Sequence, residues 1–160
     1  MNEDIENIVI LGGGQSACYA AHEIRKNNNK PNISIISNER YLPYERPPLS
    51  KDCLIDKMQF DDCSFFQKEF YEKNNIKIFH EESAEELNFN SQRVQTSKRK
   101  NVPYDKLLIA LGSSNKKFLE NGVNSENFFY LRDINESKKI KEKMLTSNNI
   151  LIIGRGFYRS

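Results

Sequence analysis

Residues 8–17 read Ile-Val-Ile-Leu-Gly-Gly-Gly-Gln-Ser-Ala, and this stretch decides the fold. Its first four residues are apolar and three of them are β-branched, which predicts a short strand buried on both faces. Residues 18–26 follow with a helical composition and with apolar positions three and four apart. The stretch therefore predicts a strand, a glycine turn and a helix, in that order.

The glycine turn fits the pattern G-x-G-x-x-G/A through Gly12, Gly14 and Ala17. Gly12 permits a tight turn, Gly14 lets a pyrophosphate approach the backbone, and Ala17 lets the helix pack closely on the strand. The N–H groups at the start of the helix then face the phosphates. The candidate nucleotide-binding residues of this turn are Gly12, Gly13, Gly14, Gln15, Ser16 and Ala17. A βαβ unit that binds no ligand is the alternative interpretation.

A second apolar run, Ile-Ser-Ile-Ile-Ser at 33–37, lies at the spacing expected for a parallel partner strand. In dinucleotide-binding units a carboxylate just beyond the second strand binds the ribose, and Glu39 is the nearest candidate. Asn38 offers an amide oxygen for part of the same role. The two strands therefore predict a dinucleotide site with Asn38 and Glu39 beside its ribose.

The loop after the second strand carries two cations on a stiff backbone. Residues 42–51 read Leu-Pro-Tyr-Glu-Arg-Pro-Pro-Leu-Ser-Lys. The two adjacent prolines fix φ and remove two donors, so the loop is predicted to be extended and to hold Arg46 and Lys51 in defined places. A guanidinium and an ammonium beside a pyrophosphate form a plausible clamp. A surface proline loop with solvated charges is the alternative.

The glycine turn together with residues 42–51 closely resembles the ferredoxin-reductase-like FAD-dependent pyridine nucleotide oxidoreductases. This family includes putidaredoxin and rhodocoxin reductases, the ferredoxin reductase components of dioxygenases, and apoptosis-inducing factor. The resemblance implies FAD as cofactor, NAD(P)H as hydride donor and a ferredoxin-type iron–sulfur protein as electron acceptor. It also implies that Arg46 and Lys51 contact FAD, with the lysine near the reactive edge of the flavin.

The second half of the chain resembles the same family. Residues 104–112 predict a further buried strand, with Leu111 where the family usually has threonine. A small antiparallel meander is predicted from three short segments, at 83–87, 93–97 and 102–104. The resemblance implies a backbone contact between Ala84 and adenine. It also implies a contact between Arg132 and FAD, with Asp133 in place of threonine.

Helices are predicted at 51–57, 64–74 and 135–145. In the second of them Phe65, Phe66, Phe70 and Tyr71 share one face, which is typical of core packing. The basic residues at 98–100 are predicted to form a solvated turn. The chain is therefore expected to be an α/β protein: a Rossmann-type FAD/NAD(P)-binding parallel sheet with helices and a small antiparallel β-meander.

Charge and hydropathy exclude several classes of partner. The 24 basic and 22 acidic residues nearly balance, at a net charge of +2, so nucleic acid is not predicted as a partner. No apolar run approaches the ~20 residues of a membrane span, and the first residues are acidic where a signal peptide would be basic. The sequence therefore predicts a cytoplasmic protein that does not insert in a membrane.

The three cysteines, Cys18, Cys53 and Cys63, show no C-x-x-C spacing, and the two histidines lie far apart. No metal site is therefore predicted. Cys18 is expected to pack as a small apolar residue in the first helix. Nine residues separate Cys53 from Cys63, which does not match the short spacing of flavin disulfide reductases, so a redox pair is the less favoured interpretation.

Residues 150–160 are predicted to begin a second strand and glycine turn, which in the resembled family opens the NAD(P)H-binding domain. Arg159 occupies the third small position of that turn. We therefore expect an FAD-binding domain at 1–147 and the truncated start of an NAD(P)-binding domain at 148–160.

The expected function is the FAD-binding portion of an NAD(P)H-dependent oxidoreductase that passes electrons to a ferredoxin-type acceptor. The chain alone is not expected to complete that cycle, and no catalytic residue is identified. One alternative is a non-catalytic flavin- or nucleotide-binding module that a second chain completes. The other is a truncated remnant without a stable function.

Overall fold

The computed structural model of the chain describes residues 5–115 and 127–154. Its strands are β1 (Asn7–Leu11), β2 (Asn32–Ile36), β3 (Ile76–Phe79), β4 (Ala84–Asn88), β5 (Arg93–Thr96), β6 (Asn101–Pro103) and β7 (Lys106–Ile109). Its helices are α1 (Gln15–Asn27), α2 (Lys68–Lys73) and α3 (Ile134–Met144), with short 3-10 turns η1 (Pro47–Ser50) and η2 (Phe60–Cys63). Within the described ranges, no helix is long and apolar enough to cross a membrane.

A four-stranded parallel sheet, in the order β3-β2-β1-β7, forms the centre of the fold. Ile10 of β1 lies opposite Ile35 of β2 and Leu108 of β7. Because all four strands are parallel, their carboxyl ends meet at one edge of the sheet. A separate antiparallel sheet, β4-β5-β6, follows β3 in the chain. The predicted parallel sheet and meander are both confirmed. The strand predicted at 104–112 is β7, but it is not buried as predicted: it lies at the edge of the sheet, and Leu108 and Ile109 are exposed.

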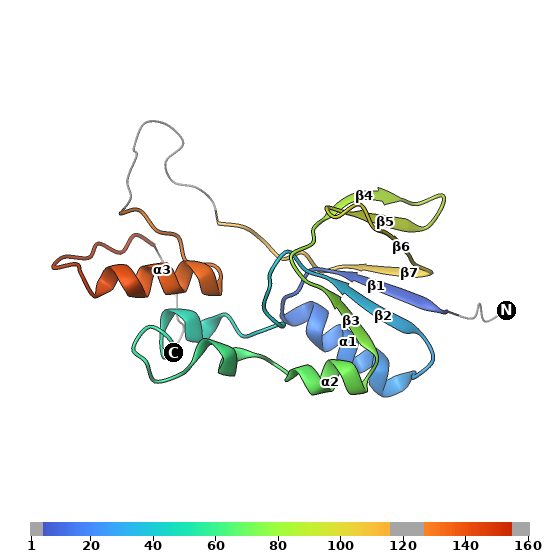
Figure 1. Cartoon of the computed structure of the whole chain (residues 1–160), viewed down its shortest axis with the longest axis horizontal. Helices are drawn as coiled ribbons and strands as arrows, with labels where there is room; N and C mark the ends of the chain where they lie inside the picture. Colours follow the sequence, from blue (N-terminus) through green and yellow to red (C-terminus); the bar gives the residue numbers. More distant parts are fainter. Residues whose placement is uncertain (1–4, 116–126, 155–160) are drawn as a thin grey trace.

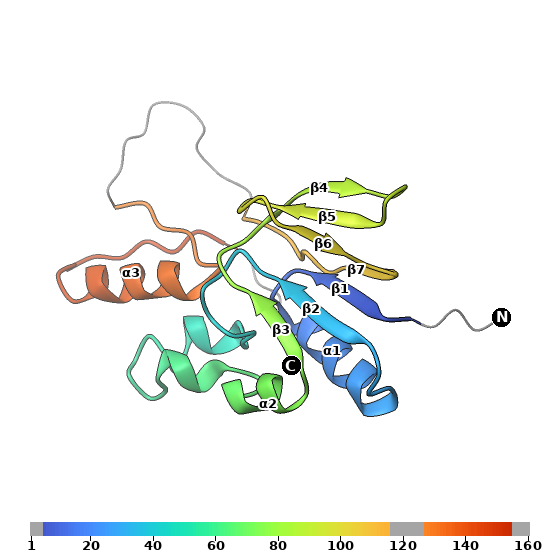
Figure 2. The same ribbon diagram turned by 45° about the vertical axis from the view of Figure 1, so that its right-hand side comes forward.

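The two faces of the parallel sheet are covered differently, which gives three layers (Figures 1 and 2). Helices α1 and α2 lie against one face, and the antiparallel sheet lies against the other. Ile10 points into the helical core with Ala17, whereas its neighbours Val9 and Leu11 pack into the core shared with the antiparallel sheet. This alternation follows from the two-residue period of a strand, and it explains why β1 is apolar at every position from Ile8 to Leu11.

A third, smaller core joins the loop after β2 to α3, which lies beside η1 in Figure 1. Its buried members are Tyr44, Leu49, Cys53, Cys63 and Ile134. The backbone N–H of Ile134 donates to Tyr44 Oη, at 3.2 Å, and Ser137 Oγ donates to the carbonyl of Leu49, at 2.7 Å. The chain after β7 is thus attached to the loop that follows β2.

Two predicted helices differ from the structure. The helix expected at 64–74 begins only at Lys68, because Ser64 pairs with Tyr44 in an isolated β-bridge and the Phe65 N–H donates to the carbonyl of Pro43. Tyr71 is nevertheless buried in the helical core, as predicted for its aromatic face. Residues 51–57 form turns after η1 instead of a helix, and Asp56 has a positive φ of 59°.

The prediction of a strand from residue 150 onward is wrong for the residues of this segment that the structure describes, 150–154. Residues 150–154 form no strand, and the side chains from Ile150 to Ile153 are exposed. A strand needs a neighbour to accept its hydrogen bonds, and no described strand pairs with this segment. Arg159 and the rest of the second glycine turn lie outside the described residues, so the domain boundary at 147/148 stays a prediction.

Candidate nucleotide site

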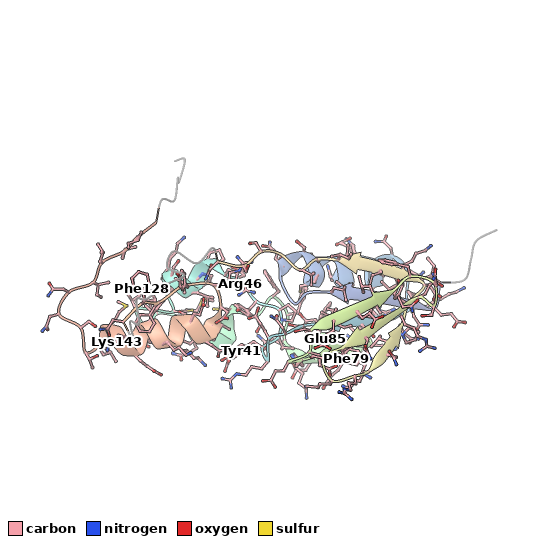
Figure 3. All side chains as sticks on the ribbon, turned by 90° about the horizontal axis from the view of Figure 1, so that it is seen from above. Tyr41, Arg46, Phe79, Glu85, Phe128 and Lys143 are labelled. Atoms are coloured by element: carbon pink, nitrogen blue, oxygen red, sulfur yellow. The ribbon has the colours of Figure 1, made fainter. Side chains whose placement is uncertain are left out.

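A cavity of about 470 Å³ lies at the carboxyl ends of β1, β2 and β7. Ten of the twelve predicted site residues line it: Gly12, Gly13, Gly14, Gln15, Ser16, Asn38, Glu39, Arg46, Ala84 and Arg132. Ala17 and Lys51 are the two that do not. Figure 3 shows Arg46 where the α3 part of the molecule meets the sheets. The fold thus gathers residues from distant parts of the chain around one cavity.

The three glycines of the turn differ in what surrounds them. A Cβ on Gly12 would lie 2.2 Å from the carbonyl oxygen of Ala110, and its φ is +109°. A Cβ on Gly13 would lie 2.3 Å from Ser37 Oγ. At Gly14, by contrast, a Cβ would meet no protein atom within 4 Å. The first two glycines are therefore required by the packing of the chain itself, whereas Gly14 leaves open space at the cavity.

Helix α1 begins at this open space, and no side chain among the described residues accepts a hydrogen bond from its first N–H groups. Gly14 is its N-cap in an extended conformation, no side chain caps it, and its first turn holds no acidic residue. The first N–H groups of a helix have no partners within the helix, and its N-terminus carries partial positive charge. Ala17 is fully buried beneath this turn, in the core with Ile10. A helix terminus of this kind is suited to an anion.

Glu39, the predicted ribose acceptor, forms an ion pair with Arg46, one of the two cations predicted to bind the pyrophosphate. Arg46 Nη2 lies 2.5 Å from Glu39 Oε1, and Tyr44 Oη donates to Glu39 Oε2, also at 2.5 Å. Arg46 Nη1 donates to the carbonyl of Arg132, at 2.6 Å, and to Tyr44 Oη, at 2.8 Å. Each carboxylate oxygen of Glu39 thus accepts one hydrogen bond within the protein, whereas Asn38 is exposed at the cavity and outside this network.

Tyr44 holds this network together from inside the third core. Its side chain is 3% exposed, and burial, followed by the hydrogen bond to Glu39, raises the pKa of its hydroxyl. The phenol therefore stays protonated at neutral pH and donates to Glu39. The same oxygen accepts from Arg46 and from Ile134 N–H.

We expect Tyr44→Phe to lower the free energy of unfolding by about 2 kcal/mol, because it leaves the buried Ile134 N–H without an acceptor. Tyr41→Phe is the matched control, since two of the contacts of its hydroxyl are exposed and the third, from Lys138, is only part-buried. Its expected loss is within about 0.5 kcal/mol. Urea unfolding of both variants measures the difference, and equal losses would contradict the role given to Tyr44.

The remaining predicted residues lie at different distances from the cavity. Ala84 begins β4 and Arg132 precedes α3, and both line the cavity wall. A Cβ on Gly112 would lie 3.3 Å from Arg132 Nη2, which places that guanidinium beside the turn after β7. Lys51 is exposed at the end of η1 and does not line the cavity, so its flavin contact stays a prediction.

Sequence reasoning missed Glu82, whose carboxyl is 2% exposed in the cavity wall. Lys100 Nζ lies 2.5 Å from Glu82 Oε1 and Lys98 Nζ lies 4.0 Å from it. The basic turn predicted to be solvated therefore neutralises a buried carboxylate. Burial by itself acts to raise the pKa of Glu82, but the hydrogen bonds from Lys100 and Thr96 outweigh it and lower that pKa. No pattern within residues 80–100 marks this pairing.

A lowered carboxyl pKa means that the pair stabilises the fold fully at neutral pH and loses this contribution as acid protonates Glu82. We expect Lys100→Met to cost about 1 to 2 kcal/mol at pH 7, because half of the Lys100 side chain is exposed and Lys98 remains nearby. The difference from the parent should shrink as the pH falls below the ordinary glutamate range. Thermal melts across that range measure it, with Lys98→Met as the weaker control. A pH-independent difference would rule out the pairing as its cause.

A family model for pyridine nucleotide-disulphide oxidoreductases matches residues 6–158. Rubredoxin-NAD(+) reductase of Pseudomonas putida is 29% identical over 149 residues, covering 93% of this chain and 39% of that protein. Monodehydroascorbate reductase 4, cytosolic, of Oryza sativa subsp. japonica is 34% identical over 165 residues, covering 93% of this chain and 38% of that protein. Putidaredoxin reductase, solved as its covalent complex with putidaredoxin, matches with a TM-score of 0.80 and 25% identity, over 87% of this chain and 34% of that one.

These matches agree with the resemblance drawn from the glycine turn and residues 42–51. The chain spans less than half the length of the relatives that it matches. The family match nevertheless includes every residue that lines the cavity, from Leu11 to Arg132. The chain belongs to the pyridine nucleotide-disulphide oxidoreductase family, whose members are FAD-dependent NAD(P)H oxidoreductases.

Proposed function

We propose that this chain binds FAD in the cavity at the carboxyl ends of β1, β2 and β7. The observation that carries the proposal is the open space at Gly14, beside the uncapped start of α1. A pyrophosphate has room there to approach backbone N–H groups. A volume of about 470 Å³ is within the usual range of cofactor cavities.

The residues present fit a dinucleotide. The start of α1 would bind the pyrophosphate, and Asn38 is the side chain best placed for a ribose hydroxyl, because Glu39 is bonded to Arg46 and Tyr44. Arg46 and Arg132 add positive charge to the lining of the cavity. Ala84 would contact the adenine through its backbone. Glu39 orients the Arg46 guanidinium through the short ion pair between them.

We further propose that the chain supplies the FAD-binding portion of an NAD(P)H-dependent oxidoreductase. FAD, when bound, would accept a hydride equivalent from NAD(P)H and release electrons to an acceptor. A ferredoxin-type iron–sulfur protein is the proposed acceptor, supported by relatives named for rubredoxin and putidaredoxin. A small organic electron acceptor is the alternative to this iron–sulfur protein, because another relative is named for monodehydroascorbate. A cytoplasmic location is part of the same proposal.

Titration of the purified chain with FAD tests the first step. We expect flavin absorbance to stay with the protein through desalting and ADP to compete for the site, because the proposed contacts lie at the nucleotide end. A protein that remains colourless at every FAD concentration would contradict the proposed site.

We also expect that stoichiometric NADH will not bleach the bound flavin at a useful rate. Residues 150–154, where the resemblance places the first strand of an NAD(P)-binding domain, form no strand. Anaerobic mixing with NADH, followed at the flavin absorbance, measures this. Dithionite reduction serves as the control that the flavin is reducible. Rapid bleaching by NADH would show that this chain alone binds and orients the nicotinamide.

A further inference from the structure

Two cysteines that lie ten positions apart in the sequence meet in the third core. Cys53 Sγ and Cys63 Sγ are 3.3 Å apart, and the side chains are 0% and 2% exposed. Both are free thiols. The third cysteine, Cys18, is in the helical core against the hydroxyl of Tyr71. The fold thus selects one pair among the three.

The backbones of this pair hold the turn that carries Arg46. The carbonyl of Cys63 accepts from Glu45 N–H, at 2.9 Å, on one side of Arg46. The N–H of Cys53 donates to the carbonyl of Pro48, at 3.1 Å, on the other side. A disulfide between the two side chains would therefore covalently link the two segments whose backbones bind the two ends of the turn at residues 45–48.

We propose that Cys53 and Cys63 are an oxidisable pair whose disulfide braces the Arg46 turn. The oxidant is a small disulfide such as oxidised glutathione. The thiolate of one cysteine attacks one of its sulfur atoms, forming a mixed disulfide and releasing one small thiolate. The second cysteine then attacks the protein sulfur of that mixed disulfide and releases the other. The pair loses two electrons and two protons, and the oxidant becomes two thiols.

The geometry requires only a small movement. The two sulfurs must approach from 3.3 Å to the roughly 2 Å of a disulfide. Residues 51–59 between η1 and η2 form turns, with Ile55 and Asp56 exposed, and so permit that movement. Burial, together with the hydrogen bond that the Cys63 thiol donates to Cys53, raises the pKa of Cys63 to about 12. Oxidation is therefore slow and passes through a local opening of this segment.

The same bond bears on the cofactor, in a step that rests on the proposed function. Arg46 lines the cavity and contacts Glu39, Tyr44 and the Arg132 carbonyl. Fixing residues 45–48 lowers the entropy that this turn loses when a ligand orders it. The oxidised chain is therefore expected to hold FAD severalfold more tightly than the reduced chain.

The experiment incubates the full chain with oxidised or reduced glutathione, then quenches it in acid and alkylates it while unfolded. We expect the oxidised sample to lose two hydrogens and to take one alkyl group, on Cys18, with a cross-linked peptide joining Cys53 to Cys63. Cys18→Ala should give the same cross-link and take no alkyl group. Three alkylated cysteines, a stable glutathione adduct or a bond to Cys18 would each overturn the proposal.

Amide hydrogen exchange tests the brace without any cofactor. Exchange at Glu45 and Cys53 should slow in the oxidised chain and return to the reduced rate after treatment with a phosphine. Cys63→Ser should show no change with oxidant, and unchanged exchange in the oxidised parent would overturn the brace. FAD release is then measured on both forms. If neither form binds FAD, the proposed function fails, while the mass map and the exchange rates still decide the disulfide.

Discussion

Gly14→Val is expected to abolish FAD binding while the protein stays folded. A Cβ at this position meets no protein atom within 4 Å, so valine has room to project into the cavity where the pyrophosphate is proposed to lie. Its φ of −90° and ψ of −172° are open to any L-residue. Losing the backbone contacts to the phosphates should weaken FAD binding by about 100-fold or more, roughly 3 kcal/mol.

The control for this variant is its own stability. Valine is a poorer N-cap than glycine, so a loss of up to about 1 kcal/mol in the free energy of unfolding is expected. Gly14→Ala, with a single added carbon, should fall between the parent and the valine variant in FAD affinity. Flavin titration and urea unfolding on the three proteins measure both quantities. Full FAD affinity in a folded Gly14→Val protein would remove the pyrophosphate from this turn.

Gly12→Ala should damage the fold itself. Alanine is strained at a φ of +109°, and its Cβ would lie 2.2 Å from the Ala110 carbonyl oxygen. That carbonyl is backbone, and Ala110 N–H is bonded to the Leu11 carbonyl, at 2.8 Å, so relief requires the chain after β7 to move away from β1. The two effects together should cost about 3 kcal/mol or more.

Urea unfolding of Gly12→Ala beside Gly14→Ala separates strain from ligand contact. The two variants add the same methyl group two residues apart. Only the first is expected to shift the unfolding midpoint strongly, and only the second keeps a folded site in which FAD affinity is measurable. A Gly12→Ala protein that loses less than about 1 kcal/mol would show that the turn relaxes freely.

Much of the parallel sheet was predictable because its signals are local. The apolar run of β1, the glycines and the helix that follows are consecutive in the sequence, and β2 shows the same apolar pattern. The periodicity of a strand or a helix needs no knowledge of distant residues. The glycine turn and residues 38–39 were predictable in the same way, because the carboxyl ends of parallel strands meet at one edge of the sheet. Ala84 and Arg132 also line the cavity, but they were expected there only through the resemblance to the ferredoxin-reductase-like family.

What the sequence did not predict depends on pairings between distant segments. The ribose contact of Glu39 stays a prediction, but its pairing with Arg46 and Tyr44, which forms once the loop folds back, was not predicted. Lys100 was expected to be solvated, but the meander returns it to Glu82. The Cys53 and Cys63 pair was disfavoured on spacing, and η2 brings the two sulfurs together. In each case the contact forms between residues that are brought together only by the tertiary fold, so the local sequence does not indicate it.

The walls of the cavity belong to three separate cores. The glycine turn stands on the helical core, Ala84 on the core between the sheets, and Arg46 on the small core that includes Ile134. A ligand that contacts all three walls couples the stabilities of the three cores, because unfolding any one core would also remove contacts to the ligand. We therefore expect the three cores to open independently in the absence of ligand. With ligand bound, they should unfold together in one sharper transition.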